Sequence, residues 1–167
     1  MVDSVRITER YNLSMASILA RRGVSAAVIG EAISVDMPVS PGWTVRAPLM
    51  VIGSGPGTWL ACGHGAGPDW CGDLARRLAG LASVSDQSGA WRTFHVEGPG
   101  ARTLLQRGAP VDLDDAAFPA GCAALTVIGH VDVIIRSLAD GRSYEVAVYR
   151  SYAESFLRWV EATVAGL

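Results

Sequence analysis

The chain has 167 residues, a length that fits one domain or one internally duplicated domain. Apolar residues make up 50% of the chain and charged residues 18%, a balance that excludes a disordered chain. The 14 basic residues, all of them Arg, and the 16 acidic residues give a net charge of −2, which excludes a basic surface for nucleic acid and a polybasic membrane signal. Because the chain contains no Lys, Schiff-base and P-loop lysine chemistry is excluded as well.

The sequence indicates neither secretion nor insertion into a membrane. Asp3 and Arg6 precede any apolar run, so the N-terminus does not have the pattern of a signal peptide. The apolar stretch over residues 14–34 is interrupted by Arg21 and Arg22, which argues against a membrane-spanning helix. The 3 cysteines are too few, and odd in number, for a disulfide framework. We therefore expect a cytoplasmic protein with reduced thiols.

The first predicted element covers residues 13–20, whose loose alternation of apolar and polar side chains favours a strand. A helix over the same residues is the alternative, because Ala and Met are good helix formers. Ser25 is a suitable N-cap for a helix over residues 26–34. Residues 36–42 are rich in Pro and other turn formers, and predict an irregular connection.

A hairpin and a second helix are predicted next. Residues 47–52 and 58–62 form the strands of the hairpin, and the glycine-rich segment 53–57 joins them. Residues 69–82 are predicted to be helical because large apolar residues recur there at spacings of four, four and three. This apolar stripe consists of Trp70, Leu74, Leu78 and Leu81.

The second half begins with a predicted strand over residues 90–97. A Gly-Pro-Gly segment follows and starts a short helix over residues 101–107, since Pro has the backbone φ of a first helical turn. Residues 109–120 are expected to form a loop. Residues 123–128 are expected to form a strand, which Gly129 ends.

The C-terminal part is predicted to be a second hairpin followed by a helix. Residues 131–136 alternate clearly, and the Asp140–Gly141 pair is a strong turn signal that leads to a return strand over 143–149. Ser151 begins a capping box with the acidic residue three positions later. The helix over residues 152–165 then carries an apolar stripe to the end of the chain.

The predicted elements repeat in the same order. Both halves, approximately residues 11–84 and 85–165, follow the order βαββα within one domain that spans 1–167. This is the order of a ferredoxin-like unit, and it predicts the α+β class, with antiparallel sheets and helices packed on them. The second half lacks a final strand. Either the duplication is incomplete, or something else covers that edge of the sheet.

The glycine-rich segment Ile52–Gly57 follows a predicted strand, as a nucleotide-binding loop would. Its spacing matches neither Gly-x-Gly-x-x-Gly nor Gly-Lys-Ser/Thr, and a strand rather than a helix is predicted after it. The sequence therefore favours a hairpin turn.

Cys62 and His64, together with Cys71, are three soft ligands of the kind that bind zinc. A structural zinc site needs a fourth ligand, and Asp69 or His95 would have to supply it from another part of the fold. Buried free thiols are the favoured interpretation.

Other reactive residue types lack the neighbours that catalysis requires. His95 and His130 accompany no Gly-x-Ser-x-Gly elbow, and neither Ser88 nor Ser151 has a base beside it in sequence. The five Trp residues fit core or interface positions.

Three acidic residues cluster in the predicted loop 109–120. Asp112, Asp114 and Asp115 could hold a hard cation, but a solvated turn is favoured. None of these candidates is favoured, so the sequence singles out no catalytic, cofactor-binding or metal-binding residue. It favours a binding or structural module over an enzyme that acts alone.

An ordered series of segments resembles the gamma subunit of heterotetrameric sarcosine oxidase. The series covers most of residues 11–165, and it is densest over residues 84–160. Its members are Leu19–Gly23, Met37–Pro38, Gly55–Leu60, Ser85–Ser88, Val96–Leu105, Asp112–Leu113, Phe118–Cys122, Thr126–Gly129 and Tyr149–Tyr152.

The resemblance implies a fold related to the folate-binding domain of the glycine-cleavage T-protein. It also implies a small structural subunit, chiefly in contact with the alpha chain, in a complex with alpha, beta and delta chains. Such complexes oxidatively demethylate sarcosine or a related N-methyl amino acid and pass the one-carbon unit to tetrahydrofolate. In the family FAD, FMN, NAD, tetrahydrofolate and zinc belong to the partner chains, and no cofactor or catalytic residue is carried over to this chain.

Two other hypotheses remain open. One is a stand-alone folate-binding or one-carbon module of the T-protein type, for which the Asp86-Gln87-Ser88 segment is the motivation. The other is a zinc-binding regulatory protein that uses Cys62, His64 and Cys71.

Overall fold

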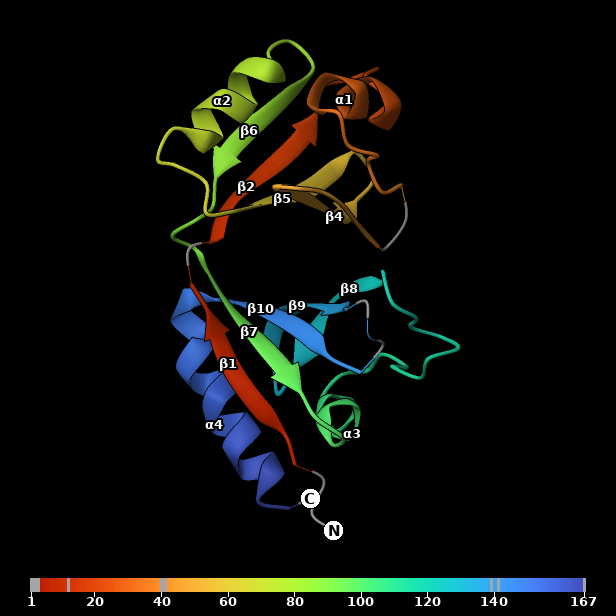
Figure 1. Ribbon diagram of the computed structural model, residues 1–167, viewed down its shortest axis with the longest axis vertical. Helices are drawn as coiled ribbons and strands as arrows, with labels where there is room; N and C mark the ends of the chain where they lie inside the picture. The colour runs from red at the N-terminus through yellow and green to blue at the C-terminus, as the bar shows by residue number, and fades with distance from the viewer. Residues whose placement is uncertain (1–3, 12, 40–41, 139, 141, 167) are drawn as a thin grey trace. The chain divides into compact units, whose positions relative to one another are not determined.

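Figure 1 shows the computed structural model, which describes residues 4–11, 13–39, 42–138, 140 and 142–166. The chain forms two compact units. Residues 12–89 make up the middle unit, and residues 1–11 with 90–167 make up the split unit. Each unit combines an antiparallel sheet with helices, which confirms the α+β class.

The middle unit contains a sheet whose described strands run in the order β3-β4-β5-β2-β6, with every neighbouring pair antiparallel. The connection from β2 to β4 passes over β5, and that from β5 to β6 passes over β2, as in a ferredoxin-like unit. Its elements are β2 (Leu13–Ala20), α1 (Ala26–Ile33), β3 (Trp43–Arg46), β4 (Leu49–Gly55), β5 (Thr58–His64), α2 (Trp70–Arg77) and β6 (Ala82–Asp86).

The core of the middle unit lies between its sheet and its two described helices. Ile18 of β2 packs in one cluster with Ile29 of α1 and with Leu74 and Leu78, at the end of α2. Because side chains alternate along a strand, only one face of the sheet contributes to this cluster. The predicted stripe of the second helix is therefore confirmed as a core-facing surface.

The split unit contains a second antiparallel sheet, and its described strands run in the order β1-β7-β10-β9-β8. Position by position, this order corresponds to β6-β2-β5-β4-β3 of the middle unit. Its elements are β1 (Arg6–Arg10), β7 (Trp91–Glu97), α3 (Ala101–Gln106), β8 (Ala123–Ile128), β9 (Val131–Ser137), β10 (Tyr144–Tyr149), a 3-10 turn (Arg150–Tyr152) and α4 (Ala153–Val164).

Strand β1 supplies the final strand that the second half of the sequence lacks. It pairs with β7 from Arg6 opposite Glu97 to Arg10 opposite Thr93, as β6 pairs with β2 in the middle unit. The sequence interpretation left this edge open and missed the strand. The charged Arg6-Ile7-Thr8-Glu9-Arg10 segment is typical of a sheet edge, where polar side chains discourage pairing with other chains.

The core of the split unit is lined by α3 and α4. Phe94 of β7 and Phe156 of α4 contact each other, with ring centroids 5.5 Å apart. Leu104 and Leu105 of α3 are fully buried in the same cluster. Tyr144 of β10 belongs to it as well, and none of its surface is exposed.

The predicted helix over residues 69–82 is too long. Helix α2 ends at Arg77, and residues 82–86 form β6. Gly80 has a φ of +79°, a backbone conformation that ends a helix and favours glycine. The apolar spacing continued past this residue, because Leu81 still packs against the core.

Two further details of the sequence interpretation are wrong. The strand expected over residues 47–52 begins only at Leu49, and residues 43–46, to which no element was assigned, form the short edge strand β3. The capping box at Ser151 does not form: the N-cap of α4 is Tyr152, without a side-chain cap. Ser151 lies within a 3-10 turn, and Glu154 instead forms an ion pair with Arg92.

Other local predictions are confirmed. Residues 13–20 form a strand rather than a helix, and the Ser25 side chain accepts a hydrogen bond from the Val28 N–H. Strands β9 and β10 form the predicted hairpin, and Asp140 Oδ1 accepts hydrogen bonds from the N–H groups of Arg142 and Ser143. Gly141 of the predicted turn lies outside the described residues, as do Ser40 and Pro41 of the first connection.

Candidate functional site

The glycine-rich segment at 53–57 is the turn of a hairpin, as the sequence favours. Strand β4 continues to Gly55, β5 begins at Thr58, and the register shifts between Gly53 and Gly55. No helix follows the segment, so it lacks the helix N-terminus that a phosphate-binding loop uses.

The zinc hypothesis finds no cluster in the structure. Cys62 is buried in β5, His64 is exposed at the end of that strand, and Cys71 lies in α2. Burial first, and then the charge of Asp86, raise the pKa of the Cys71 thiol, which keeps it protonated and a poor metal ligand. Across the part of the chain that the structure describes, no group of three His, Cys, Asp or Glu residues could hold a metal ion.

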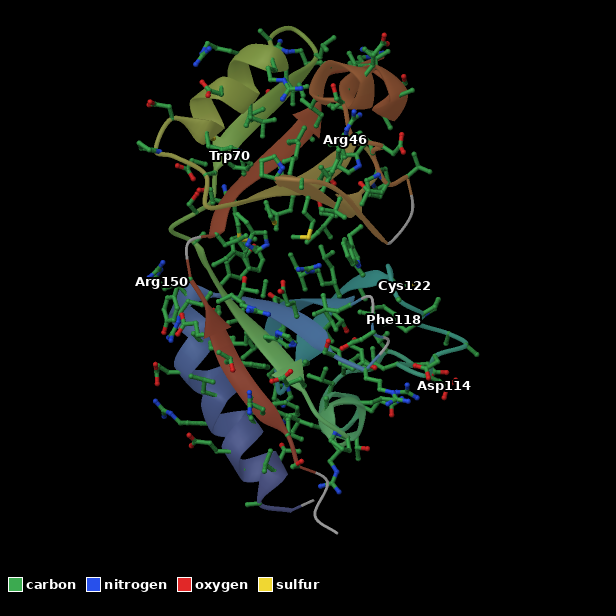
Figure 2. The ribbon with its side chains drawn as sticks, viewed as in Figure 1. Arg46, Trp70, Asp114, Phe118, Cys122 and Arg150 are labelled. Carbon is green, nitrogen blue, oxygen red and sulfur yellow. The ribbon has the colours of Figure 1, made fainter. Side chains whose placement is uncertain are left out.

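The loop acids stabilise their own loop. Asp112 Oδ1 accepts a hydrogen bond from the Asp114 N–H, and Asp114 Oδ1 accepts one from the Ala116 N–H. Asp115 pairs with the Arg102 guanidinium. Asp114 lies on the outer part of the loop between α3 and β8 (Figure 2). These contacts are those of a solvated turn with an ion pair.

Asp86 ends β6, Gln87 and Ser88 follow it in the chain, and hydrogen bonds link this segment to β2. The Ser88 hydroxyl contacts the backbone N–H and carbonyl of Met15, and the Gln87 N–H donates to the same carbonyl. Asp86 Oδ1 accepts from the Ser88 N–H, and the hydrogen bonds from Ser88 lower the pKa of Asp86. The segment is therefore engaged in local structure.

His95 and His130 lie in different environments. His95 is half-buried in β7, its Nδ1 contacts the Arg10 guanidinium, and its Nε2 lies 3.8 Å from Glu97 Oε2. His130 occupies the turn between β8 and β9 with a φ of +69°. Neither histidine has a hydrogen-bonded serine or cysteine among the described residues, so the geometry of a nucleophile and its base is not formed there.

Two of the ion pairs that join strands of the split unit's sheet are largely shielded from solvent. Arg92 of β7 and Glu9 of β1 form two hydrogen bonds, of 2.6 and 2.7 Å, which lower the pKa of Glu9. Arg136 of β9 and Glu145 of β10 lie opposite each other, and their side chains are only 9% and 8% exposed. The Arg136 Nε donates to Glu145 Oε2 at 3.0 Å. Such a buried pair is sensitive to the loss of either partner.

A pocket of 640 Å³ in the split unit is the candidate functional site. Its polar lining includes Glu97, Arg102, Asp140, Arg142, Ser143 and Tyr144. Tyr144 pairs with Val96, so the end of β7 lies beside the start of β10. The residues between β7 and α3 therefore lie close to the residues that follow the β9–β10 turn.

Two arginines and a tyrosine dominate the chemistry of this pocket. Arg102 forms ion pairs with Asp115 and, at 3.5 Å, with Asp114. The Asp115 carboxylate first, and then Tyr144, raise the pKa of Arg102, which places the Tyr144 side chain beside the guanidinium. The Tyr144 hydroxyl is buried beside the Arg102 guanidinium, which can only donate, so the hydroxyl proton meets no acceptor among the described residues.

Sequence reasoning did not select these pocket residues. Arg102 falls within the Val96–Leu105 segment, Arg142 follows the predicted Asp140–Gly141 turn, and Tyr144 falls within the predicted return strand. Their spacing of about forty residues carries no signal, because the pairing of β7 with β10 alone brings them together. A second pocket, of 580 Å³, lies in the middle unit between α1 and β3 and includes Glu31 and Arg46.

Comparisons with known proteins agree with this fold. The model of the family described as sarcosine oxidase, gamma subunit, matches residues 20–166. No curated protein sequence matches the chain. Among the described residues, no helix is both long enough and apolar enough to cross a membrane.

Two solved structures share the fold. A chain of the heterotetrameric sarcosine oxidase from Corynebacterium sp. U-96, in complex with pyrrole 2-carboxylate, has a TM-score of 0.88 at 20% identity, over 99% of this chain and 86% of that chain. The glycine cleavage system aminomethyltransferase T from Bartonella henselae has a TM-score of 0.67 at 11% identity, over 93% of this chain and 45% of that chain. The second match confirms the predicted kinship of the fold with the T-protein.

Proposed function

Because the chain belongs to the sarcosine oxidase gamma subunit family, we propose that it is a non-catalytic assembly subunit of a heterotetrameric flavoenzyme. The complex would oxidatively demethylate sarcosine or a related N-methyl amino acid, and would transfer the one-carbon unit to tetrahydrofolate on another subunit. The observation that carries this proposal is the family match over residues 20–166.

The partners in this proposal are alpha, beta and delta chains, with the alpha chain as the main contact. FAD, FMN, NAD, tetrahydrofolate and zinc are assigned to those partners, and the complex to the cytoplasm. Residues 53–57 form a hairpin turn and not the start of a helix that could bind a nucleotide phosphate. This geometry supports the assignment of the nucleotide cofactors to the partner chains. Burial raises the pKa of the Cys71 thiol, which disfavours the thiolate that binds zinc and supports the assignment of zinc to a partner chain.

The low charge of the chain also supports an assembly role. Several large apolar side chains are exposed, among them Leu125 and Val127 on the edge strand β8, with 51% and 40% of their surfaces accessible. Exposed apolar side chains that gather in one place are typical of surfaces that contact other proteins. We therefore expect the chain to aggregate or self-associate when it is expressed alone.

The first experiment is recovery of the chain from its native host through a tag, followed by a visible absorption spectrum of the eluate. The expected result is a yellow complex with three further chains in equal amounts. The same tag on an unrelated protein is the control for adventitious capture. A colourless, monomeric chain would contradict the assembly role.

A second experiment tests whether the subunit is non-catalytic. His95→Gln and Ser88→Ala each remove a side chain of a type that can take part in catalysis and that lies outside the pocket. The amine oxidation rate per bound flavin should stay within about twofold of the wild type for both variants, since no role in the chemical step is assigned to either residue. A loss of about a hundredfold in either variant would show a catalytic role.

The stand-alone folate module is the alternative function. Its support is the fold shared with the aminomethyltransferase, but this chain covers only 45% of that protein, and Asp86 and Ser88 bind the local backbone. Calorimetry with tetrahydrofolate and the purified chain decides between the two. Saturable binding at one site per chain would favour the alternative.

A further inference from the structure

The pocket of the split unit contains an unsatisfied polar group that calls for a partner. Tyr144 is fully buried, and its hydroxyl lies beside the Arg102 guanidinium, which is a donor, so the hydroxyl proton has no acceptor among the described residues. A buried hydroxyl without a partner is unfavourable, and folded proteins rarely leave one in that state. Because Tyr144 lines the pocket, a ligand there can accept the missing hydrogen bond.

The positive groups of the pocket are arranged to receive an anion. Arg102 is held in place by Asp115 and Asp114, so its guanidinium is oriented before any ligand arrives. Arg142 also lines the pocket and is exposed to solvent, and although its charge acts on Asp115 it forms no ion pair within 4.0 Å among the described residues. Arginine is well suited to carboxylate and phosphate groups, because its planar fork donates two parallel hydrogen bonds.

The acidic groups of the pocket are already occupied. Asp140 accepts hydrogen bonds from the Ser143 hydroxyl, at 2.8 and 2.7 Å, and from two backbone N–H groups. Glu97 lies 3.4 Å from Arg6 and 3.8 Å from His95. Neither carboxylate is therefore placed to satisfy the Tyr144 hydroxyl, and the remaining hydrogen-bonding capacity of the pocket is mainly donor capacity.

We propose that this pocket binds a small ligand through an oxyanion, a carboxylate or a phosphate, which accepts hydrogen bonds from the Tyr144 hydroxyl and the Arg142 guanidinium. Arg102 adds positive charge behind the oxyanion. A volume of 640 Å³ falls in the range of about 300–1,000 Å³ that small-molecule sites occupy. The proposal concerns the chain itself and does not depend on which complex it joins.

The test is a titration of the full chain, labelled with carbon-13 at the Tyr ring carbon that bears the hydroxyl. The chain has only 4 Tyr residues, and Tyr144→Phe identifies the Tyr144 signal by its disappearance. Sodium phosphate and sodium acetate are titrated separately at constant ionic strength, with sodium chloride as the control for screening. The expected result is a saturable shift of the Tyr144 signal with at least one of the two oxyanions.

The two arms distinguish the sources of the oxyanion. Saturation with phosphate alone assigns a phosphate ligand, and saturation with acetate alone assigns a carboxylate ligand. Saturation with both supports the shared chemistry. A Tyr144 signal that shifts with neither oxyanion, or that shifts equally with chloride, overturns the proposal.

Variants separate binding from folding. Arg142→Ala removes an exposed side chain and should weaken binding at least tenfold, whereas Arg158→Ala removes an exposed arginine outside the pocket and should leave binding unchanged. Tyr144→Phe should abolish the phosphate- or acetate-dependent rise in melting temperature with little change in the melting temperature of the free chain, because the hydroxyl proton has no acceptor to lose there. Equal binding by the Arg142 and Arg158 variants would overturn the proposal.

Discussion

Replacement of Gly98 by Ala tests how the N-terminal segment is attached to the split unit. Gly98 follows β7 and has a φ of +108°. A Cβ atom at this position would lie 2.2 Å from the carbonyl oxygen of Ser4 and 3.2 Å from its carbonyl carbon. Both are backbone atoms, so the substitution must displace the residues that lead into β1.

The expected loss has two parts. The unfavourable φ destabilises the folded chain by about 2 kcal/mol when any residue other than glycine adopts it. Displacement of β1 removes the packing of Val5 and Ile7, which are partly buried against the core, and this adds about 2 kcal/mol. Gly98→Ala should therefore lower the free energy of unfolding by about 4 kcal/mol.

Gly121→Ala is the matched control. Gly121 lies in the same unit and has a φ of +91°, but no atom lies within 4 Å of the Cβ position. Only the backbone contribution applies, so the expected loss is about 2 kcal/mol. The difference between the two variants isolates the contact with Ser4.

Urea unfolding followed by tryptophan fluorescence measures both free energies, and amide hydrogen exchange reports on residues 6–10 directly. Exchange at these amides should accelerate in Gly98→Ala and stay unchanged in Gly121→Ala. Equal losses in the two variants, with protected amides in β1 throughout, would refute the reasoning that Gly98 permits the approach of the N-terminal segment.

Three further predictions concern the ion pairs and the C-terminal helix. Glu145→Gln should destabilise the chain by about 3 kcal/mol because it removes the carboxylate that pairs with the buried Arg136 guanidinium. Arg136→Met with Glu145→Leu should cost less than the single change, and a double-mutant cycle without coupling would contradict this. Because Arg92 lowers the pKa of Glu9 below its ordinary value of 4.5, the pair stabilises the chain above that pH and its contribution is lost as the pH falls. Glu9→Gln should thus flatten the loss of stability in acid, as measured by urea unfolding at several pH values. Trp159→Ala should lower the free energy of unfolding by about 3 kcal/mol, because the ring packs against the core; an unchanged value with lost co-purification would place the ring at a partner interface.

Elements with a strong local signal could be predicted from the sequence. The alternation over residues 131–136, the stripe of Leu74 and Leu78, and the cap at Ser25 each depend on residues a few positions apart. The helix boundary after Arg77 was missed because the apolar spacing continued to Leu81. Gly80 was the available signal for the end of the helix.

The strands that sequence reasoning missed are β1, β3 and β6, and each lies at an edge of its sheet. Edge strands are short and carry polar side chains, so their own residues show little apolar alternation. They become strands because a partner strand satisfies their backbone groups along one side. For β1 that partner is β7, more than eighty residues away in the chain.

The candidate site depends on the same long-range pairing. Composition, turn residues and apolar periodicity determined the α+β class and the βαββα order, because these properties are local. The register that sets Tyr144 opposite Val96 is set between separate strands, and it alone brings Arg102 and Arg142 to one pocket. Burial depends on neighbours that no local pattern identifies. The packing of strands and helices alone therefore decided which buried polar groups, such as the Tyr144 hydroxyl, remain unsatisfied.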